Sequence, residues 1–343
     1  MVAVTANGRV MLVPSNGQQR VAKEIITRLN MPVIAPPASR ASGAKGHLWE
    51  QAVLPVRLRG RPLWSPSTSA PMFYRNQVVT VHDLGFVDVP QYFAPRFAAT
   101  YRTIVKRVAR VAKHLITVSE FSRRRIIEQY GLPESQVSAV YLGISEAFSL
   151  RSADDVAAVR EEFGIGSAPY VIAFSGNDPR KNTQGILDAW EELGAKRDGA
   201  KLVLFGRSSN ASIFNTASGE TELTDVIRVG GISDETLAAL FSGANGLVFP
   251  SFYEGFGLPI VEAAASGAPI ITTGFGAMAE IAPRTALLVD PQSRQELAKA
   301  MLDCLGKTPD DATRRELSDE MKRYNWNDTA AEYRRIFAAT FGD

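Results

Sequence analysis

The sequence has little cysteine and no long apolar run. Among its 343 residues there is one cysteine, Cys304, so no disulfide can form within the chain. A lone cysteine is typical of a reducing compartment, and we expect it to act as a small apolar residue on a helix. The longest uncharged stretch towards the C-terminus, residues 263–279, is interrupted by three glycines and a proline, so we expect no membrane-spanning helix. With no signal peptide visible, the sequence predicts a cytoplasmic protein.

Several motifs of phosphate and nucleotide chemistry are also missing. No G-x-G-x-x-G follows the first expected strand, which argues against a NAD-dependent dehydrogenase. The basic residues lack the aromatic interleaving of a nucleic-acid-binding surface, so we expect no nucleic-acid partner. No D-x-D pair is present to hold a metal ion against a diphosphate, so we expect neither a metal nor another cofactor.

Charge is divided unevenly between the two halves of the chain. Residues 1–150 contain 19 basic and 8 acidic residues, a net charge of +11, whereas residues 151–343 contain 19 and 28, a net charge of −9. This difference indicates two domains with different partners. A basic half is suited to phosphates or to anionic lipid, and its charge gathers in three clusters. The clusters are Arg57, Arg59 and Arg61; Arg96, Arg102, Lys106, Arg107, Arg110 and Lys113; and Arg123, Arg124 and Arg125.

Short apolar runs alternate with segments of helical periodicity, which predicts α/β domains with parallel sheets. The strands expected in the first half are residues 10–13, 78–81 and 115–118, and the helices are 21–29, 97–113 and 122–130. In the second half we expect strands at 170–174, 202–205, 246–250 and 269–273, and helices at 153–163, 183–193, 234–241, 259–266 and 328–341. We place the domains at 1–150 and 151–325, followed by a C-terminal helix in 326–343.

The most informative segment is FPSFYEGFGLPIVEAAASGAPI, residues 249–270. A strand enters a glycine-containing loop, Pro259 opens a helix and Gly267 ends it. The N–H groups of Phe256, Gly257 and Leu258 are free near the helix start, which suits a diphosphate. Glu254 in the loop and Glu262 in the first helical turns can accept hydrogen bonds from sugar hydroxyls. The structural alternative is an ordinary strand-to-helix turn with a solvated Glu262.

Three further segments are weaker candidates. In SGNDPRKNTQG, residues 175–185, Arg180 and Lys181 precede a helix and can face a phosphate, or they are simply solvated. His82 follows an apolar strand, at the edge where open α/β sheets bind ligands, although a lone histidine is more often structural. Gly17 precedes the first helix and allows close approach of the backbone to a ligand.

Together these segments resemble family 4 of the retaining nucleotide-sugar glycosyltransferases. Their GT-B architecture has two Rossmann-like domains, with the active site in the inter-domain cleft. The resemblance covers nearly the whole chain, and its most specific part is the E-x7-E element from Glu254 to Glu262. Residues 7–25 resemble members that build bacterial surface polysaccharides. Residues 118–145 resemble the segment closing the first domain, and 324–337 the helix that crosses back to it.

The resemblance implies roles on the donor side, in the second domain. Glu262 would bind the ribose hydroxyls and Glu254 the donor sugar, while Lys181, with Arg180, would neutralise the diphosphate. The turn containing Gly231 and Ile232 would meet the base through its backbone. The free N–H groups of Phe256, Gly257 and Leu258 complete this donor site.

On the acceptor side, in the first domain, His82 would lie beside the transferred sugar and Gly17 would shape the roof of the donor site. The catalytic set is then His82, Glu254 and Lys181. Many members carry an arginine where this chain has Asn177, so charge neutralisation would depend more on Lys181 and Arg180.

The sequence therefore predicts a retaining, metal-independent hexosyltransferase of polysaccharide biosynthesis. GDP-mannose is the favoured donor, and a glycan or lipid-linked glycan is the acceptor. A UDP-sugar-dependent transferase and a non-catalytic nucleotide-sugar-binding module remain alternatives, as does a nucleotide-sugar epimerase or a glycan phosphorylase. The basic clusters predict peripheral association with the anionic inner face of the membrane.

Overall fold

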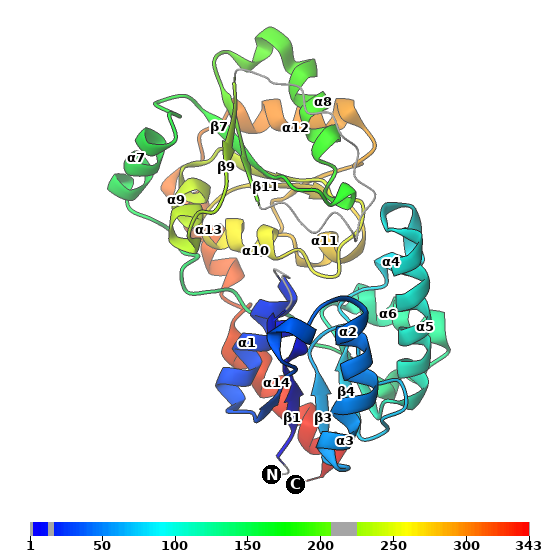
Figure 1. The fold of residues 1–343 in the computed structure, drawn as a ribbon. Coiled ribbons are helices and arrows are strands. Elements are labelled where there is room, and N and C mark those ends of the chain that lie inside the picture. Colours follow the sequence, from blue (N-terminus) through cyan, green and yellow to red (C-terminus); the bar gives the residue numbers. More distant parts are fainter. Residues whose placement is uncertain (1–2, 13–16, 207–224, 343) are drawn as a thin grey trace. The chain divides into compact units, whose positions relative to one another are not determined.

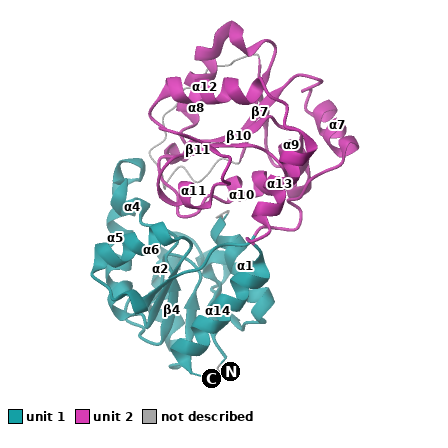
Figure 2. Ribbon diagram, turned by 180° about the vertical axis from the view of Figure 1, so that it is seen from behind, with its two compact units in different colours: residues 1–143, 325–343 teal, residues 144–324 magenta. Residues whose placement is uncertain are grey.

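The computed structural model describes residues 3–12, 17–206 and 225–342 (Figure 1). The chain divides into two compact units, which are described separately. Unit 1 comprises Met1–Gly143 and Asn325–Asp343, and unit 2 comprises Ile144–Tyr324 (Figure 2). In the part of the chain that the structure describes, no helix combines the length and the hydropathy needed to cross a bilayer.

Unit 1 is built on a parallel sheet in the order β2-β1-β3-β4-β5-β6. Its strands are β1 (Thr5–Asn7), β2 (Val33–Ile34), β3 (Leu63–Ser65), β4 (Gln77–Thr80), β5 (His114–Thr117) and β6 (Val137–Ala139). Its longer helices are α1 (Gly17–Leu29), α5 (Pro95–Val111), α6 (Glu120–Tyr130) and α14 (Trp326–Phe341). The shorter ones are η1 (Gly8–Leu12), η2 (Ala38–Arg40), α2 (Gly43–Leu48), η3 (Trp49–Val53), α3 (Leu54–Leu58), α4 (Gly85–Asp88), η4 (Pro90–Tyr92) and η5 (Glu134–Gln136). Because the strands are parallel, the loops that follow them lie at one edge of the sheet.

The C-terminal helix α14 belongs to unit 1, although it follows unit 2 in the chain. Figure 1 shows it beside α1, and the Arg28 Nε atom of α1 donates to Asn327 Oδ1. Its Tyr333 is fully buried and packs edge-on against Trp64 of β3, with ring centroids 5.3 Å apart. The Tyr333 hydroxyl lies 3.2 Å from Thr80 Oγ1 of β4. Aromatic packing on β3 and β4 therefore anchors the last helix to the first sheet.

Unit 2 contains a second parallel sheet, in the order β12-β11-β10-β7-β8-β9. Its strands are β7 (Tyr170–Phe174), β8 (Lys201–Phe205), β9 (Val226–Val229), β10 (Gly246–Phe249), β11 (Ile270–Thr273) and β12 (Leu287–Val289). Its helices are α7 (Ala153–Glu162), η6 (Pro179–Lys181), α8 (Thr183–Leu193), η7 (Gly194–Arg197), α9 (Asp234–Gly243), α10 (Leu258–Ala265), α11 (Gly276–Ile281), α12 (Arg294–Leu305) and α13 (Asp311–Met321).

The core of unit 2 joins α8 and α12 to the sheet. Trp190 of α8 and Met301 of α12 are fully buried with Val171 of β7 and Val248 of β10. Cys304 lies in the same cluster, and burial raises the pKa of its thiol to about 11. The cysteine is therefore a small apolar core residue on a helix, as the sequence predicts.

Two expectations differ from the structure. Residues 10–13 were expected as a strand, but β1 ends at Asn7 and η1 follows; Val13 lies outside the described residues. The strand prediction was wrong because Arg9 turns into the protein, where Glu50 pairs with it. The units meet at Gly143 and Ile144 rather than near residue 150. Residues 144–150 join unit 2, since Phe148 packs against Phe241.

Candidate active site

The carboxyl edge of the unit 2 sheet brings two predicted site residues together. β7 and β10 are hydrogen-bonded neighbours, so the loops that follow them lie side by side. Lys181 comes from the first loop and Glu254 from the second, and Lys181 Nζ donates to Glu254 Oε1 at 2.5 Å. Lysine carries three donors and glutamate two oxygens, so this contact uses only part of their capacity. Neither side chain has another hydrogen-bond partner among the described residues.

Aromatic rings support the ammonium group of Lys181. Nζ lies 5.2 Å from the ring centroid of Phe174 and 5.0 Å from that of Phe249, the last residues of β7 and β10. The negative faces of these rings attract a cation. The lysine side chain is 15% exposed and that of Glu254 is 11% exposed. The charge is therefore held in place while its tip remains accessible.

The two loops are also tied together by hydrogen bonds. Phe252 N donates to Arg180 O at 2.8 Å, and Asn182 Nδ2 donates to Pro250 O at 3.4 Å and, after β12, to Pro291 O at 2.7 Å. Asn182 adopts a left-handed conformation, with φ of 57°, directly before α8. These bonds reduce the freedom of the loop, so that Lys181 is presented from a fixed backbone.

Arg180 has a local partner that the sequence reading did not foresee. Its guanidinium contacts the Asp178 carboxylate at two points, with Nε 3.1 Å from Oδ1 and Nη2 2.7 Å from Oδ2. Both side chains are nearly buried. The carboxylate therefore occupies two of the guanidinium nitrogens of Arg180, whereas Lys181 Nζ makes one hydrogen bond among the described residues and keeps two donors.

At the start of α10, two of the three backbone N–H groups predicted to bind an anion have no partner among the described residues. Gly257 precedes the helix with φ of +108°, a conformation that L side chains rarely adopt. Among the described residues, the N–H groups of Gly257 and Leu258 donate no hydrogen bond, and they lie at the positive end of the helix. Phe256 is buried and stacks edge-on against Tyr324. Glu262 follows one turn later and is 6% exposed, so it is not the solvated residue of the structural alternative.

The remaining unit 2 candidates lie in loops at the same sheet edge. Asn177 is exposed after β7. Gly231 follows β9 with φ of +70°, and Ile232 precedes Ser233, whose side chain caps α9. These residues follow β7 and β9, which belong to one parallel sheet with β8 between them, so their loops lie at the same edge. Their contacts with a nucleotide stay predictions.

In unit 1, His82 occupies the position expected from the sequence, just after β4. Its Nε2 lies 2.9 Å from Pro66 O. A carbonyl only accepts, so Nε2 carries the proton and Nδ1 keeps a lone pair. Burial lowers the pKa of this imidazole, although the hydrogen bond to Pro66 O and the nearby Asp83 oppose the shift, and the neutral ring is favoured. Gly17 is exposed at the first position of α1.

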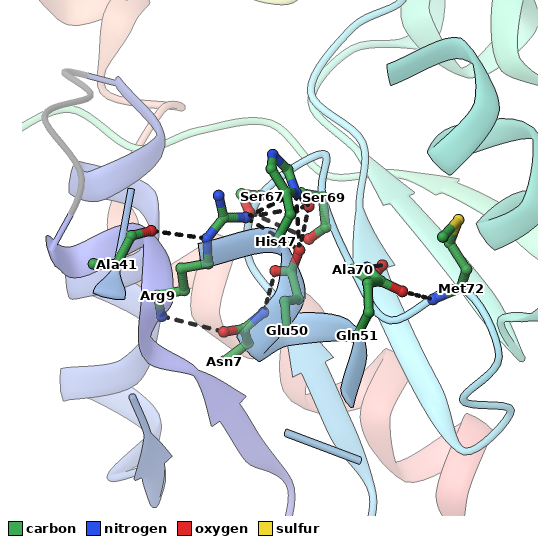
Figure 3. A network of polar contacts seen from close by, with 10 residues as sticks. All are labelled: Asn7, Arg9, Ala41, His47, Glu50, Gln51, Ser67, Ser69, Ala70 and Met72. Carbon is green, nitrogen blue, oxygen red and sulfur yellow. Dashed lines mark hydrogen bonds and ion pairs between the residues drawn. The ribbon is translucent and has the colours of Figure 1, made fainter. Parts of the chain in front are cut away.

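Sequence reasoning missed a second polar group in unit 1, shown in Figure 3. Its centre is an ion pair between Arg9 Nη1 and Glu50 Oε2 at 3.1 Å, with the Glu50 side chain completely buried. Asn7, His47 and Ser69 surround the pair. No local pattern links Arg9 to Glu50, which are 41 residues apart. No pattern in the sequence indicated this pair, because β1 was not predicted and Arg9 precedes the strand expected at residues 10–13.

The polar contacts among the described residues include no cluster of metal-ligating side chains. Across residues 3–12, 17–206 and 225–342, histidine, cysteine and carboxylate side chains form no group of three or more able to hold a metal ion. The site residues of unit 2 form an arrangement of one lysine, two carboxylates and a helix start. Chemically, this arrangement can bind a polyanion bearing hydroxyl groups.

Comparison with known proteins agrees with this geometry. Residues 169–307, within unit 2, match the model of the glycosyl transferases group 1, and residues 61–148 match that of glycosyltransferase family 4. The chain is 27% identical over 275 residues to the O-antigen chain mannosyltransferase B of Escherichia coli, covering 78% of this chain and 71% of that protein.

Two further relatives extend the comparison. The chain is 33% identical over 238 residues to the MMP alpha-(1->4)-mannosyltransferase of Mycolicibacterium hassiacum, covering 66% of this chain and 54% of that protein. The structure of HepE from Anabaena, in complex with UDP and glucose, superposes with a TM-score of 0.74 at 16% identity, covering 99% of this chain and all of that one. The fold is therefore GT-B, with two parallel-sheet α/β domains. The chain belongs to the glycosyltransferases, with a family 4 domain and a group 1 domain, and it is a hexosyltransferase.

Proposed function

We propose that the chain transfers mannose from GDP-mannose to a glycan or lipid-linked glycan during polysaccharide biosynthesis. The observation that carries the donor site is the Lys181–Glu254 pair at the carboxyl edge of the unit 2 sheet. Mannose is favoured because two similar proteins are named mannosyltransferases. A UDP-sugar is the alternative donor, because HepE, with the same fold, was solved with UDP and glucose.

Each donor group has a matching partner in this proposal. Lys181 Nζ turns its unused donors to the diphosphate, and the N–H groups of Gly257 and Leu258 complete the anion site. Glu254 binds hydroxyls of the transferred sugar through its unused oxygen, and Glu262 binds the ribose. Arg180 stays paired with Asp178 and acts at longer range.

We further propose that the reaction retains the anomeric configuration and needs no metal. The acceptor oxygen attacks C1 on the face from which the diphosphate leaves. The C1–O bond to phosphate breaks with its electron pair on the diphosphate, and the acceptor proton passes to a phosphate oxygen. Lys181 and the helix start stabilise the charge that develops. His82, neutral and holding a lone pair on Nδ1, accepts a hydrogen bond from a hydroxyl of the transferred sugar.

A thermal-shift panel of GDP, UDP, ADP and TDP tests the donor. A ligand at 100 times its dissociation constant adds about 2.7 kcal/mol to the stability of the folded state. We expect GDP to give the largest shift. A larger shift with UDP would select the alternative donor, and no shift with any of the four would contradict the proposed function. A chain that binds GDP but turns over no donor would be the non-catalytic module.

Product analysis tests the chemistry. We expect full turnover of GDP-mannose in EDTA and a product whose NMR coupling shows the configuration of the donor. Activity lost in EDTA and restored by magnesium or manganese would overturn metal independence. An inverted product would overturn the front-face reaction.

Peripheral membrane association is also proposed, with a more specific surface than the sequence indicated. Arg123 is paired with Glu120, and Arg125 with Asp88 and Glu128, so these arginines are partly neutralised. The exposed Phe73, with the Arg107 guanidinium 4.9 Å above its ring, offers both apolar and cationic contact. Gln51 ties the Phe73 loop to η3, since its Nε2 donates to Ala70 O and its Oε1 accepts from Met72 N. The Phe73 surface is thus made of Phe73 and Arg107.

Sedimentation with vesicles tests this surface. We expect binding to vesicles rich in anionic lipid and much weaker binding in about 0.5 M salt, where charges are screened within a few ångströms. Arg107→Glu should weaken binding more than Arg123→Glu, the matched control. Equal binding to neutral and anionic vesicles, or none to either, would refute the docking proposal.

A further inference from the structure

A buried polar cluster in unit 1 has no part in the function proposed above. It consists of Asn7, Arg9, His47, Glu50 and Ser69 and is called here the Arg9 cluster (Figure 3). Asn7 ends β1, Arg9 follows it, and Ser69 lies in the loop after β3. The cluster therefore stands at the carboxyl edge of the first sheet, where open α/β sheets bind ligands.

The contacts of Glu50 hold Arg9 in one position. Asn7 Nδ2 donates to Glu50 Oε1 at 2.8 Å, while Arg9 Nη1 and the Ser69 hydroxyl both donate to Oε2. On its other side, Arg9 Nε donates to Ala41 O at 3.0 Å. Both oxygens of Glu50 are thus used within the cluster. The second terminal nitrogen of Arg9, Nη2, has no partner among the described residues.

His47 provides a second outward donor. Its Nδ1 lies 3.4 Å from Arg9 Nη1. Because arginine can only donate, we assign Nδ1 as the acceptor and place the proton of the neutral ring on Nε2. Burial and the charge of Arg9 lower the pKa of this imidazole to about 4, so the neutral form prevails. Glu50, Ser69 and the ring of Tyr101 are its other neighbours, and the side chain is 26% exposed.

A cluster of this kind is poorly explained by stability alone. Moving an arginine and a glutamate out of water costs much of what their attraction returns, and apolar residues of similar volume often stabilise a fold equally well. Such an arrangement is, however, effective at holding a donor in place. Its two unused groups, Arg9 Nη2 and His47 Nε2, both donate hydrogen bonds, and the carboxylate that could repel an anion is already saturated.

We propose that Arg9 and His47 form an oxyanion subsite of unit 1 that binds a phosphate group of the acceptor, with Glu50 as its positioning residue. The inference rests on the proposed function, because it gives unit 1 the acceptor. Phosphate is favoured over a neutral hydroxyl because both unused groups of the cluster are hydrogen-bond donors. Unit 1 also carries 21 basic and 10 acidic residues, so its field attracts an anion.

The test uses NMR of the histidine rings with inorganic phosphate as the probe. The chain has three histidines, so His47→Gln assigns the His47 signal and leaves those of His82 and His114 as internal references. We expect phosphate to shift the His47 signal saturably and to raise the pKa of the ring. The same shift should occur in Lys181→Ala, which separates this subsite from the donor site.

Variants of the cluster make the test specific. In Arg9→Lys, which keeps the charge but loses Nη2, the phosphate dissociation constant should rise at least tenfold. In Ser69→Ala, which removes one bond to Glu50 and leaves both outward donors, it should change less than twofold. The affinity for GDP should be unchanged in both variants, and this measurement checks that each variant remains folded.

Two outcomes would overturn the subsite. One is a His47 signal that does not move, or that moves linearly with phosphate. The other is equal phosphate affinity in Arg9→Lys and wild type. If GDP and UDP also fail to bind, the proposed function fails as well; if they bind normally, only the subsite fails. A soluble hexose phosphate and a short-chain isoprenyl phosphate, each compared with its dephosphorylated form, then distinguish a free from a lipid-linked phosphate.

Discussion

Two ion pairs stand at the carboxyl edges of the two sheets, and their surroundings differ. In unit 1 the Glu50 side chain is 0% exposed, and both of its oxygens accept hydrogen bonds from neighbours besides Arg9. In unit 2 Lys181 and Glu254 have side chains 15% and 11% exposed, and their only polar contact among the described residues is with each other. Glu50 is thus saturated, whereas the unit 2 pair has unused capacity on both partners.

The difference indicates how each unit uses charge. A saturated carboxylate serves to fix its partner, because any movement breaks several bonds at once. An unsaturated pair at a sheet edge can accept a ligand without first losing its internal contact. The net charge of the two units also differs: unit 1 is net basic, whereas unit 2 has 17 basic and 26 acidic residues. In unit 2, Lys181 is therefore a local cation in an acidic domain.

The two ion pairs should differ most in what the loss of the carboxylate costs in free energy of unfolding. Glu50→Ala leaves Arg9 buried without a counter-charge, which should cost about 3–5 kcal/mol. Glu254→Ala should cost less, because Lys181 keeps the faces of Phe174 and Phe249 and reaches water more easily. Hydrogen exchange of the β1 and β10 amides measures each loss in its own unit. Equal losses would remove the distinction between the pairs.

The next effect concerns turnover. Lys181→Ala removes the accessible cation from the donor site and should lower turnover by about 10²–10³-fold, the usual cost of losing one transition-state donor. Lys196→Ala, an exposed lysine of the same unit, is the control and should leave turnover unchanged. Initial rates at saturating donor decide the matter. Turnover within threefold of wild type in Lys181→Ala would assign the leaving-group charge to another residue.

A smaller effect should follow from the second carboxylate. Glu262→Ala removes the partner of the ribose and should weaken nucleotide binding by about 1.5–3 kcal/mol, roughly 10- to 150-fold. The measurement is calorimetric titration with the free nucleoside diphosphate. Glu316→Ala, which changes a carboxylate of α13, serves as the control. Unchanged affinity in Glu262→Ala would show that this carboxylate does not meet the ribose.

The smallest effect is a pH dependence that should belong to unit 1. The His47 pKa is lowered from 6.5 to about 4, so between these values the unfolded chain binds more protons than the folded one. The free energy of unfolding therefore falls as the pH drops through this window. From pH 7 to pH 5 the loss should be about 1 kcal/mol, since solvent partly screens the ring. Urea unfolding of His47→Gln should show a smaller loss than wild type; identical pH profiles would contradict this.

Much of the fold was predictable because it depends on local patterns. The strand expected at 170–174 and the helix at 183–193 coincide with β7 and α8, where apolar periodicity and glycine boundaries agree. Shorter elements such as β2 and β3 were missed, because two or three residues give too little periodicity. The segment after β1 was mispredicted, because Val10 to Leu12 are apolar while the conformation is set by the distant partner of Arg9.

In the candidate site, too, local patterns predicted the positions of residues but not their contacts. Glu254, Glu262 and Lys181 could be proposed as site residues because each stands close to a strand end or a helix start in the sequence; their roles stay predictions. The pairing of Lys181 with Glu254 could not be predicted, because the contact spans 73 residues and depends on the order of the strands. The contact between Arg180 and Asp178 joins residues only two apart, but the sequence predicted that Arg180 faces a phosphate or solvent, not a neighbouring carboxylate.

The central claim is that the carboxyl edge of the unit 2 sheet binds the donor diphosphate through Lys181. Calorimetric titration of GDP and UDP in EDTA, with wild type, Lys181→Ala and Lys196→Ala, tests it most directly. We predict saturable binding to wild type and Lys196→Ala, and at least tenfold weaker binding to Lys181→Ala. Equal affinity in all three proteins, or no binding of either nucleotide to wild type, would contradict the claim.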